Sequence, residues 1–514
     1  MNKFCILAAG KGTRNNNIVN LHKALLPLEN KPVISHIIDR LNSNVNIVVA
    51  LGYKSDQIKS YLETTHTDRN ITFVNVDNYD GPGSGPGYSL LCCKSELQEP
   101  FVFTSVDTVI DSNLDIMNIN ENWIGISSID TKYALNYCLV EGSKYLDRFY
   151  YGSGESAYIG MAGIYEYDKY WAALEERKIL KDEYQVIHGF DGLEKIKLIN
   201  FTWYDTGNNE SYDKARKIFN TEVVANKSAE AIFIEKGKVV KYFNNEKTIK
   251  TRIDRALYLD GCAPCVKQIN NNMYVYNYVE GKLLSEIMDE NILNKFFDFY
   301  QNKLYRPLKD INFITNCKIM YEDKTKSRLQ SLFGSEIDNV SEINGVKTLP
   351  IKDLLDKIDW SNFYNKAIPS QFHGDLQPEN IIYNDNNDEF ILIDWRETFG
   401  NSLQVGDVYY DLSKLYHAIL INGKSILEEK YHYIINGDKA FIHFYAKSNL
   451  IYFMGIFKEF CNKYNYDWYH VELLGILHYL NICTLYNNFQ NGEYGKFLFL
   501  YGKYLLTKYV EHHG

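Results

Sequence analysis

The stretch that decides the fold opens the chain and reads Lys3-Phe4-Cys5-Ile6-Leu7-Ala8-Ala9-Gly10-Lys11-Gly12-Thr13-Arg14. The apolar run from Lys3 to Ala8 has the length of a buried strand and leads directly into a glycine-rich turn. Open α/β sheets bind ligands at such turns, beyond the carboxyl ends of their strands. The opening stretch therefore predicts an α/β domain with a ligand site at one edge of its sheet.

The same pattern continues to about residue 222, because short β-rich runs alternate with amphipathic segments. Helices are expected at residues 33–41 and 55–62, and strands at 46–51 and 101–105, the last of which ends at Asp107. This rhythm predicts a Rossmann-like, mostly parallel mixed sheet with helices on both faces.

Length, charge and cysteine content limit the classes of protein. The 514 residues leave room for roughly two to four domains. The net charge of −10, from 55 basic and 65 acidic residues, argues against nucleic-acid binding. No apolar run is long enough for membrane insertion, and the apolar start is too short for a secretion signal. The nine cysteines are therefore expected as reduced thiols in the cytoplasm, and Cys262 and Cys265 as packed thiols at a turn rather than metal ligands.

A change of pattern near residue 229 marks a second domain. Residues 229–243 hold two apolar runs around a Lys-Gly turn, which predicts an antiparallel hairpin. Beyond residue 405 helical spacing dominates, with helices expected at 409–421, 439–464, 469–489 and 495–511. We place the boundary between Thr221 and Lys227, so that the domains are 1–222 and 227–514, with a small lobe at about 227–280 and a helical large lobe at about 281–514.

The glycine-rich turn has the chemistry of a polyphosphate site. Gly10 and Gly12 let backbone amides approach phosphate oxygens, while Lys11 and Arg14 supply positive charge. Lys23 follows nine residues beyond Arg14, so three cations are expected to converge on one triphosphate. The alternative is that Lys23 only decorates the surface.

Several segments of the first part of the chain carry a family resemblance: the glycine loop, the Lys23-Ala24-Leu25-Leu26-Pro27 run, the Gly52-Tyr53-Lys54 turn, the strand ending at Asp107, and Trp203-Tyr204-Asp205-Thr206-Gly207. Together they resemble the sugar-phosphate and choline-phosphate nucleotidyltransferases, whose domain is GT-A-like. The resemblance implies that Asp107 and Asp205 hold Mg²⁺ between the triphosphate and the attacking phosphate. It also implies that Arg14 and Lys23 stabilise the leaving pyrophosphate, and that residues 163–165 lie near the acceptor.

The resemblance also assigns the nucleotide contacts of this domain to Leu7, Ala8, Ala9, Gly10, Lys11, Gly12, Thr13, Gly83 and Ser84. The last two belong to the glycine-dense loop 81–89, which we expect over the base or the acceptor. A flexible turn explains that loop almost as well. His22 stands where the family usually has proline, and the Pro-Leu-Thr run after Arg14 is missing, so the base and the acceptor stay open.

A second motif reads His373-Gly374-Asp375-Leu376-Gln377-Pro378-Glu379-Asn380 and is followed by Asp394 at the end of a hydrophobic strand. This spacing matches the catalytic loop and metal aspartate of kinases. Residues 226–514 resemble the choline kinase and aminoglycoside phosphotransferase family, which implies an α+β, protein-kinase-like domain with two lobes. By that resemblance Asp375 accepts the substrate's hydroxyl proton, and Asn380 and Asp394 bind Mg²⁺ on the phosphates of ATP.

The remaining kinase parts are assigned by the same resemblance. Lys241 is expected at the α and β phosphates, with Asp254 or Glu246 as its acidic partner, and the segment from Tyr276 to Val279 is expected to hold adenine. His373 is expected to have a structural role.

Arg396 is the one sign of what the acceptor is. It follows Asp394 closely, where a guanidinium would repel a quaternary ammonium and favour a carboxylate or phosphate on the substrate. Glu397 could instead neutralise it.

These observations predict a bifunctional, Mg²⁺-dependent enzyme. It would phosphorylate a small alcohol, amino alcohol or sugar with ATP, then couple the product to an NTP, with CTP expected, and release pyrophosphate for capsule or lipopolysaccharide decoration. One alternative is an anomeric sugar kinase joined to a sugar-1-phosphate nucleotidyltransferase that uses UTP or another NTP, for sugar salvage. Another is that one half is a degenerate binding module. Assembly into a homo-oligomer is left open.

Overall fold

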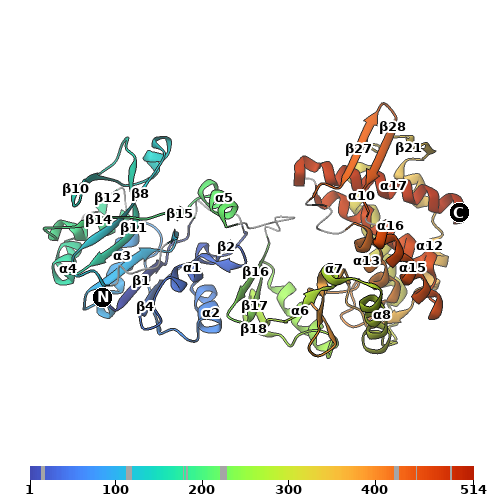
Figure 1. Cartoon of the computed structure of the whole chain (residues 1–514), viewed down its shortest axis with the longest axis horizontal. Helices are drawn as coiled ribbons and strands as arrows, with labels where there is room; N and C mark the ends of the chain where they lie inside the picture. The colour runs from blue at the N-terminus through green and yellow to red at the C-terminus, as the bar shows by residue number, and fades with distance from the viewer. Residues whose placement is uncertain are drawn as a thin grey trace. The chain divides into compact units, whose positions relative to one another are not determined.

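The computed structural model describes residues 1–12, 18–111, 118–176, 179–180, 183–219, 229–421, 426, 428–446, 448–486 and 489–513 (Figure 1). Contacts within the chain divide it into two compact units. The first unit is Met1–Glu222, Lys227–Glu246 and Gln268–Val275, and the second is Val223–Asn226, Lys247–Lys267 and Tyr276–Gly514. The expected boundary between Thr221 and Lys227 lies outside the described residues.

The first unit is built on a nine-stranded mixed sheet. Its main path has the order β10 (Leu146–Tyr150), β9 (Leu139–Gly142), β11 (Ser156–Ile164), β6 (Phe101–Ser105), β1 (Lys3–Ala8), β4 (Asn46–Leu51) and β5 (Ile71–Asn75). Off this path, β8 (Trp123–Ser128) pairs with β11 and with β14 (Lys197–Asn200). The strands β6, β1, β4 and β5 are parallel, and β11 runs antiparallel to β6. The predicted mixed α/β sheet is therefore confirmed, and its three expected strands have the predicted bounds.

Helices cover both faces of this sheet because β1 is buried on both sides. Phe4 and Ile6 join one apolar core with residues of α1 (Val33–Asp39) and α2 (Ser55–Thr65). Cys5 and Leu7 join the opposite core with α3 (Pro86–Cys92) and α4 (Tyr167–Glu175). Such a strand has no polar face, as parallel sheets require. The remaining elements up to residue 219 are β2 (Pro27–Leu28), β3 (Lys31–Pro32), β7 (Thr108–Ile110), β12 (Ile179–Leu180), β13 (Glu183–Tyr184), β15 (Trp203–Asp205) and α5 (Asn209–Ile218).

Most of a four-stranded sheet from the middle of the chain also groups with the first unit. Its order is β16 (Glu230–Glu235), β17 (Lys238–Phe243), β19 (Met273–Asn277) and β18 (Lys267–Asn270), and β16 and β17 form the predicted antiparallel hairpin. Phe233 shares the core of α2 and lies edge-on to Tyr61, with ring centroids 5.4 Å apart. The expected small lobe at 227–280 is therefore split between the two units. Its strands pack on α2, whereas most of α6 (Glu246–Tyr258) groups with the second unit.

The second unit combines helices with small sheets. Its helices are α7 (Leu284–Ile287), α8 (Glu290–Phe299), α9 (Phe313–Lys318), α10 (Lys324–Leu329), α11 (Ile351–Asp356), α12 (Trp360–Asn365), α13 (Val408–Leu420), α15 (Ser448–Lys463), α16 (Trp468–Cys483) and α17 (Glu493–His513). Its strands are β20 (Lys282–Leu283), β21 (Glu342–Ile343), β22 (Val346–Lys347), β23 (Pro369–Ser370), β24 (Ile381–Asn384), β25 (Glu389–Leu392), β26 (Gly406–Asp407), β27 (Tyr431–Asn436) and β28 (Lys439–Phe444). In the described parts of the chain no helix is long and apolar enough to cross a membrane.

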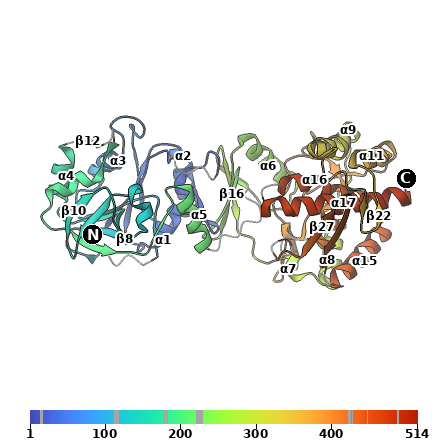
Figure 2. The ribbon, with the colours of Figure 1, turned by 90° about the horizontal axis from the view of Figure 1, so that it is seen from above.

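One expected helix of the second unit is wrong. The segment 439–464 begins with β28, which pairs antiparallel with β27, and becomes helical only in α15. Gly437 and Asp438, with Gly437 at φ +61°, form the two-residue turn of this hairpin between two alternating runs. The hairpin packs against α17 (Figure 2).

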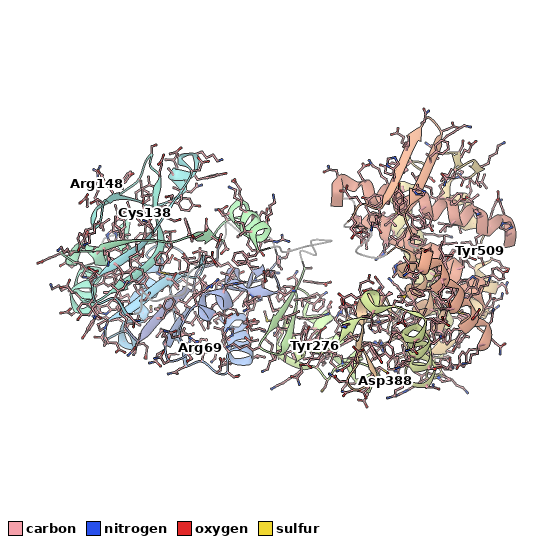
Figure 3. The ribbon with its side chains drawn as sticks, viewed as in Figure 1. Arg69, Cys138, Arg148, Tyr276, Asp388 and Tyr509 are labelled. Carbon is pink, nitrogen blue, oxygen red and sulfur yellow. The ribbon has the colours of Figure 1, made fainter. Side chains whose placement is uncertain are left out.

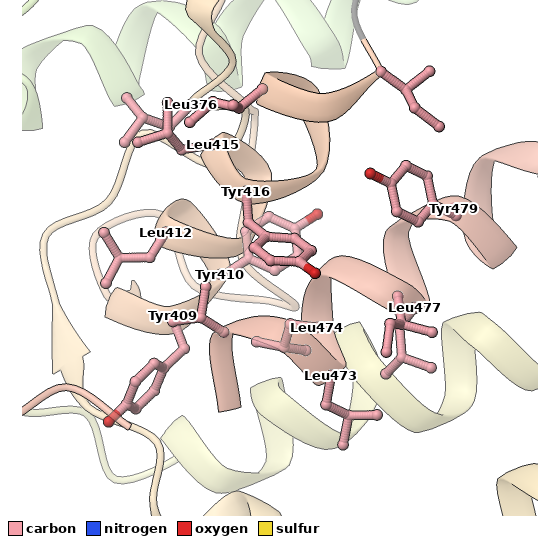
Figure 4. Close-up of a cluster of buried hydrophobic side chains, with 14 of the residues drawn as sticks. Leu376, Tyr409, Tyr410, Leu412, Leu415, Tyr416, Leu473, Leu474, Leu477 and Tyr479 are labelled. Carbon is pink, nitrogen blue, oxygen red and sulfur yellow. The ribbon is translucent and has the colours of Figure 1, made fainter. Parts of the chain in front are cut away.

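The core of the second unit is rich in tyrosine and leucine. Figure 4 shows labelled side chains of α13 and α16 clustered together, among them Leu412, Leu415 and Leu474. Leu376, from the predicted catalytic loop, belongs to the same cluster. The loop is therefore anchored on the helical core.

Candidate active sites

The two predicted metal aspartates of the first unit lie side by side. The antiparallel pairing of β15 with β7 places Asp205 opposite Thr108, the neighbour of Asp107. A β-carbon added to Gly207 would lie 3.0 Å from Oδ1 of Asp205 and 3.2 Å from Oδ2 of Asp107. Burial and the negative charge of Asp107 raise the pKa of Asp205. Two carboxylates that disfavour each other's ionisation are a site that a divalent cation would stabilise.

Lys23 reaches these carboxylates directly. Its Nζ lies 2.9 Å from Oδ2 of Asp107, and both side chains are largely buried. The side chain passes the glycine loop, since a β-carbon on Gly12 would lie 2.7 Å from Cδ of Lys23. Lys23 is therefore part of the site and does not merely decorate the surface.

His22 explains how the chain supports Lys23 without the usual proline. Its Nδ1 accepts a hydrogen bond from the amide of Ala24 at 3.0 Å, so its Nε2 carries the proton and donates to the carbonyl of Gly10 at 3.2 Å. Burial, together with the positive charge of Lys23, lowers the pKa of His22 to about 3. A neutral imidazole thus joins the glycine loop to the Lys23 segment.

Gly12→Ala is expected to lower nucleotidyl transfer about 10- to 100-fold, because the new β-carbon would displace Lys23 from Asp107. Gly237→Ala, in the turn between β16 and β17 of the same unit, is the matched control: Gly237 also has a positive φ, +73° against +63° for Gly12, but nothing lies within 4 Å of its added β-carbon. Steady-state pyrophosphate release measures both variants. Equal losses in the two would show that backbone strain, rather than the position of Lys23, matters.

The stability of the first unit is expected to fall as the pH falls from about 6.5 towards 3. The pKa of His22 is lower in the folded chain than the ordinary value of 6.5, so the unfolded chain binds more protons and acid favours unfolding. The slope contributed by this one residue approaches about 1.4 kcal/mol per pH unit within that window. Hydrogen exchange of the β1 amides between pH 4.5 and 7.5 measures it, and His22→Gln, which does not titrate, should show a shallower dependence. Identical pH dependence in both proteins would contradict this.

A cavity of about 460 Å³ opens beside the aspartates. It is lined by residues of β6, β7, β11 and β15 and of two loops: Ser105, Asp107, Thr108, Asn136, Tyr137, Tyr158, Ile159, Gly160, Trp203, Asp205, Gly207 and Asn208. The hydroxyl of Tyr137 donates to Oδ2 of Asp205 at 2.9 Å. The expected acceptor segment 163–165 does not line it, because Gly163 packs against the indole of Trp123. The part of β11 that faces the cavity is 158–160 instead.

The glycine-dense loop 81–89 owes part of its composition to packing. β-Carbons on Gly85 and Gly87 would lie within 2.8 Å of backbone atoms of Tyr184 and Gln185, and the amide of Tyr184 donates to the carbonyl of Ser84. A β-carbon on Gly81 or Gly83 would lie within 4 Å of no backbone atom of another segment.

The other expected nucleotide residues differ in their surroundings. Leu7 to Ala9 are buried, and Lys11 pairs with Asp80. Thr13 and Arg14 lie outside the described residues.

The predicted kinase residues of the second unit also meet. The side-chain amide of Asn380 donates to the carbonyl oxygen of Asp375 at 2.8 Å and approaches its Oδ2 at 3.4 Å. The amide of Ile393, just before Asp394, donates to the carbonyl of Asn380 at 2.9 Å. Asp394 has a left-handed φ of +58°, a strained conformation that aims a side chain out of the strand direction. A carboxylate, an amide and a second carboxylate are thus collected at one place.

The ionisation of Asp375 is set by its neighbours. Burial alone would raise its pKa, but the ammonium of Lys414, 3.0 Å away, and the amide of Gln377 lower the pKa to about 2. The backbone just before Asp375 is held by Asp411, whose carboxylate accepts from the amides of His373 and Gly374 at 2.6 Å each. Asp375 is therefore a fixed, ionised hydrogen-bond acceptor.

His373 has the expected structural role. Its Nδ1 accepts from the amide of Asp375 at 3.2 Å, and its Nε2 donates to the carbonyl of Ile393 at 2.9 Å. Burial lowers its pKa to about 4, so the ring is neutral and joins the catalytic loop to the strand of Asp394.

The sequence interpretation missed Arg252. From α6, its Nη1 lies 2.8 Å from Oδ1 of Asp394 and its Nε lies 2.9 Å from Oε1 of Glu397. Arg255, three residues on, donates to backbone carbonyls of Phe372 and Leu403. The sequence does contain a sign of this contact, because two arginines lie three residues apart on the apolar face of 246–258. A buried guanidinium needs a hydrogen-bond acceptor, so each arginine predicts a buried partner. Glu397 therefore forms its ion pair with Arg252, and its negative charge also acts on Arg396.

The remaining assigned residues lie in different units. Lys241 is buried on β17 of the first unit. Glu246, at the start of α6, is exposed and belongs to the same unit, whereas Asp254 belongs to the second unit. Tyr276, labelled in Figure 3, lies in the second unit at the end of β19, where burial and the charge of Asp394 raise its pKa. Val279 follows β19. The roles of these residues stay predictions.

A third group of ionisable side chains lies away from both sites. Asp39, His66 and Glu235 bring their ligand atoms within 4.8 Å of one another. Lys31 bonds to Asp39 and lies 3.7 Å from Glu235, so its ammonium already balances the carboxylates. We interpret this group as an ion network that attaches β16 to the first unit.

Comparison with known proteins concerns the first of these sites. The sequence model of the MobA-like NTP transferase domain matches residues 4–114, which include the glycine loop, Lys23 and Asp107. Residues 4–114 are thus similar in sequence to MobA-like NTP transferase domains.

Individual relatives match parts of the chain. The bifunctional protein GlmU of Methanococcus maripaludis strain S2 is 28% identical over 127 residues, which are 24% of this chain and 29% of that protein. GlmU of Methanocaldococcus jannaschii is 24% identical over 212 residues, or 39% of this chain and 50% of that protein. The chain thus spans between three tenths and a half of the length of these relatives.

Two solved structures each match about two fifths of the chain. A UDP-glucose pyrophosphorylase complexed with UDP-glucose covers 43% of this chain and 98% of its own, with a TM-score of 0.38 and 16% identity. The CTP:phosphocholine cytidylyltransferase LicC of Streptococcus pneumoniae covers 42% and 98%, with a TM-score of 0.35 and 18% identity.

Proposed function

We propose that the chain is a bifunctional enzyme that first phosphorylates a small hydroxyl compound with ATP and then couples the product to an NTP. One observation carries the proposal: a single chain holds two separate clusters of carboxylates, each beside cationic or amide groups suited to nucleotide phosphates. The first is Asp107 and Asp205 with Lys23, and the second is Asp375, Asn380 and Asp394.

The first site would transfer a nucleotidyl group. The phosphate of the acceptor attacks the α-phosphorus of the NTP, and the bond to pyrophosphate breaks. Lys23 neutralises the leaving pyrophosphate, and the amides of the glycine loop bind its oxygens. The paired carboxylates of Asp107 and Asp205 would hold Mg²⁺, which supplies charge neutralisation on the phosphates. No nucleophile from the protein is needed.

The second site would transfer the terminal phosphoryl group of ATP. Asp375 accepts a hydrogen bond from the attacking hydroxyl and takes its proton as the new bond forms. With a pKa of about 2, Asp375 acts mainly by orienting the hydroxyl, and proton transfer is late. Asn380 and Asp394 would hold Mg²⁺ on the phosphates, and Arg252 would exchange its contact with Asp394 for a contact with ATP.

The two steps follow one another chemically, since the first product is the second acceptor. We propose CTP as the nucleotide, and a role in supplying activated groups for capsule or lipopolysaccharide. The alternative is a sugar kinase joined to a sugar-1-phosphate nucleotidyltransferase that uses UTP or another NTP.

Turnover assays distinguish the CTP-dependent enzyme from the sugar alternative. ATP plus each of choline, ethanolamine, glycerol, glycerate, glucose and N-acetylglucosamine is combined with each of the four NTPs, and ADP and pyrophosphate are measured separately. We expect ADP and then pyrophosphate with one non-sugar acceptor and CTP. Turnover with a hexose alone would replace the proposal by the sugar alternative, and release of ADP without pyrophosphate under all conditions would mean that the first unit only binds nucleotide.

A further inference from the structure

Four cationic side chains gather around one tyrosine beside Asp375. Tyr410 and Lys414 stand one turn apart on α13, and Lys324 and Arg328 stand one turn apart on α10. The Nζ of Lys324 lies 3.3 Å from the hydroxyl of Tyr410. Arg396 comes from the segment after Asp394, and its amide donates to the carbonyl of His373 at 3.0 Å. We call Lys324, Arg328, Arg396 and Lys414 the cation cluster.

The carboxylates of the described residues do not balance this cluster. Lys414 pairs with Asp375, but neither Lys324, Arg328 nor Arg396 forms an ion pair with a described carboxylate. Among the acids next to these cations in the sequence, Asp323 is exposed and Glu322 pairs with Lys326. Glu397 acts on Arg396 through its charge, but its ion pair is with Arg252. Arg328 donates to the carbonyl of Asn481 at 2.8 Å, and Arg396 donates from Nε to the carbonyl of Thr398 at 3.1 Å, and neither acceptor carries charge.

The neighbouring groups respond to this excess of positive charge. Burial and the other cations lower the pKa of Lys324 to about 8, and the cations overcome burial to lower the pKa of Tyr410 to about 7. His478, whose ring centroid lies 5.1 Å from that of Tyr410, is held neutral by burial and by Lys414. Cations that are partly desolvated and unbalanced cost free energy, and an anion bound among them would recover it.

We propose that the cation cluster binds an anionic group, a carboxylate or a phosphate, on the compound whose hydroxyl is phosphorylated at Asp375. Lys324 and Arg396 contact this group, and Tyr410 donates a hydrogen bond to it. This inference rests on the proposed kinase function of the second unit. It makes the acceptor a hydroxy acid or a phosphorylated alcohol rather than choline or ethanolamine, whose cationic ends the cluster would repel.

The reaction is complete with such an acceptor. The hydroxyl oxygen forms a bond to the γ-phosphorus of ATP, the bond between that phosphorus and the β,γ-bridging oxygen breaks, and ADP leaves. The hydroxyl proton passes to Asp375 and then to solvent. The anionic group itself is unchanged, so the cation cluster acts by binding and orienting.

Matched acceptors and matched variants test the proposal. The acceptors form pairs that differ in one anionic group: glycerate and glycerol, serine and ethanolamine, glycerol 1-phosphate and glycerol, and glucuronate and glucose, with choline added. Lys324→Gln removes one charge of the cluster. Lys326→Gln, on the same helix, removes the partly exposed lysine that pairs with Glu322.

For the wild type we expect kcat/KM to be at least 10-fold higher for one anionic member than for its partner. In Lys324→Gln the KM for that acceptor should rise about 10-fold or more, while the KM for ATP and kcat change little, and Lys326→Gln should behave as the wild type. Preference for a neutral or cationic acceptor would overturn the inference and leave the kinase proposal intact. A rise in the KM for ATP alone would overturn it too, because the cluster would then serve the nucleotide.

Sulfate provides a readout that needs no turnover. Titrated into the full-length protein, it should raise the melting temperature of the second unit in the wild type and in Lys326→Gln, and less so in Lys324→Gln. If no acceptor is phosphorylated, an equal shift of the melting temperature in the wild type, Lys324→Gln and Lys326→Gln overturns the inference. Failure of the kinase proposal itself is distinct: ATP hydrolysis that is the same in the wild type and in Asp375→Asn would show it.

Discussion

Asp375→Asn is expected to abolish ATP-dependent phosphorylation, with kcat reduced by about 10² to 10⁴. The asparagine keeps the size of the side chain and the bond to Gln377, but it neither accepts the hydroxyl proton nor pairs with Lys414. Release of pyrophosphate from a supplied phosphorylated acceptor and NTP should continue at the wild-type rate. Separate assays of ADP and pyrophosphate measure the two activities in one full-length protein.

The control for this variant is Asp388→Asn. Asp388 lies in the same unit and pairs with Lys295 at 2.7 Å, but its side chain is exposed and belongs to neither cluster (Figure 3). Full phosphorylation activity in Asp375→Asn would remove Asp375 from the mechanism. Loss of both activities would mean that the two sites are not independent.

Asp107→Asn is expected to impair nucleotidyl transfer and to leave ATP-dependent phosphorylation intact. The substitution removes the carboxylate that pairs with Lys23, which is also one of the two carboxylates assigned to Mg²⁺. Nucleotidyl transfer should therefore fall at least about 100-fold, while phosphorylation continues. The concentration of Mg²⁺ needed for half-maximal pyrophosphate release should also rise.

The control here is Asp147→Asn on β10, an exposed residue of the same sheet. It should leave the rate and the Mg²⁺ dependence unchanged. If Asp107→Asn lowers the rate but Mg²⁺ dependence stays as in the wild type, then Asp107 serves only to position Lys23, and the metal site lies elsewhere.

The sheet of the first unit and its carboxylates could be predicted from the sequence because the signals are local. A buried strand such as 3–8 is apolar on both sides, and Asp107 directly follows such a strand. The pairing of Asp107 with Asp205 came only from family resemblance, since it depends on β7 and β15, two strands of three residues that have no periodicity of their own.

The parts that could not be predicted depend on residues distant in sequence. Arg252 reaches Asp394 across 142 positions, and the cation cluster joins α10 to α13, so of these residues only Arg396 could be singled out from the sequence. The hairpin of β27 and β28 is a different case, because its Gly437-Asp438 turn is visible in the sequence. The alternating Tyr431 to Phe444 run was overlooked next to the longer helical patterns that surround it.

The assignment of β16 to β19 to the first unit has a practical consequence for anyone who wishes to study one half alone. The first unit consists of three stretches of chain, and the hydroxyl of Tyr242 donates to the carbonyl of Val19, while Lys236 pairs with Asp68. A fragment that stops at residue 222 would expose the apolar surface that covers Phe233. No single truncation yields both halves intact, so expression of isolated fragments should give aggregated material where the point variants stay soluble.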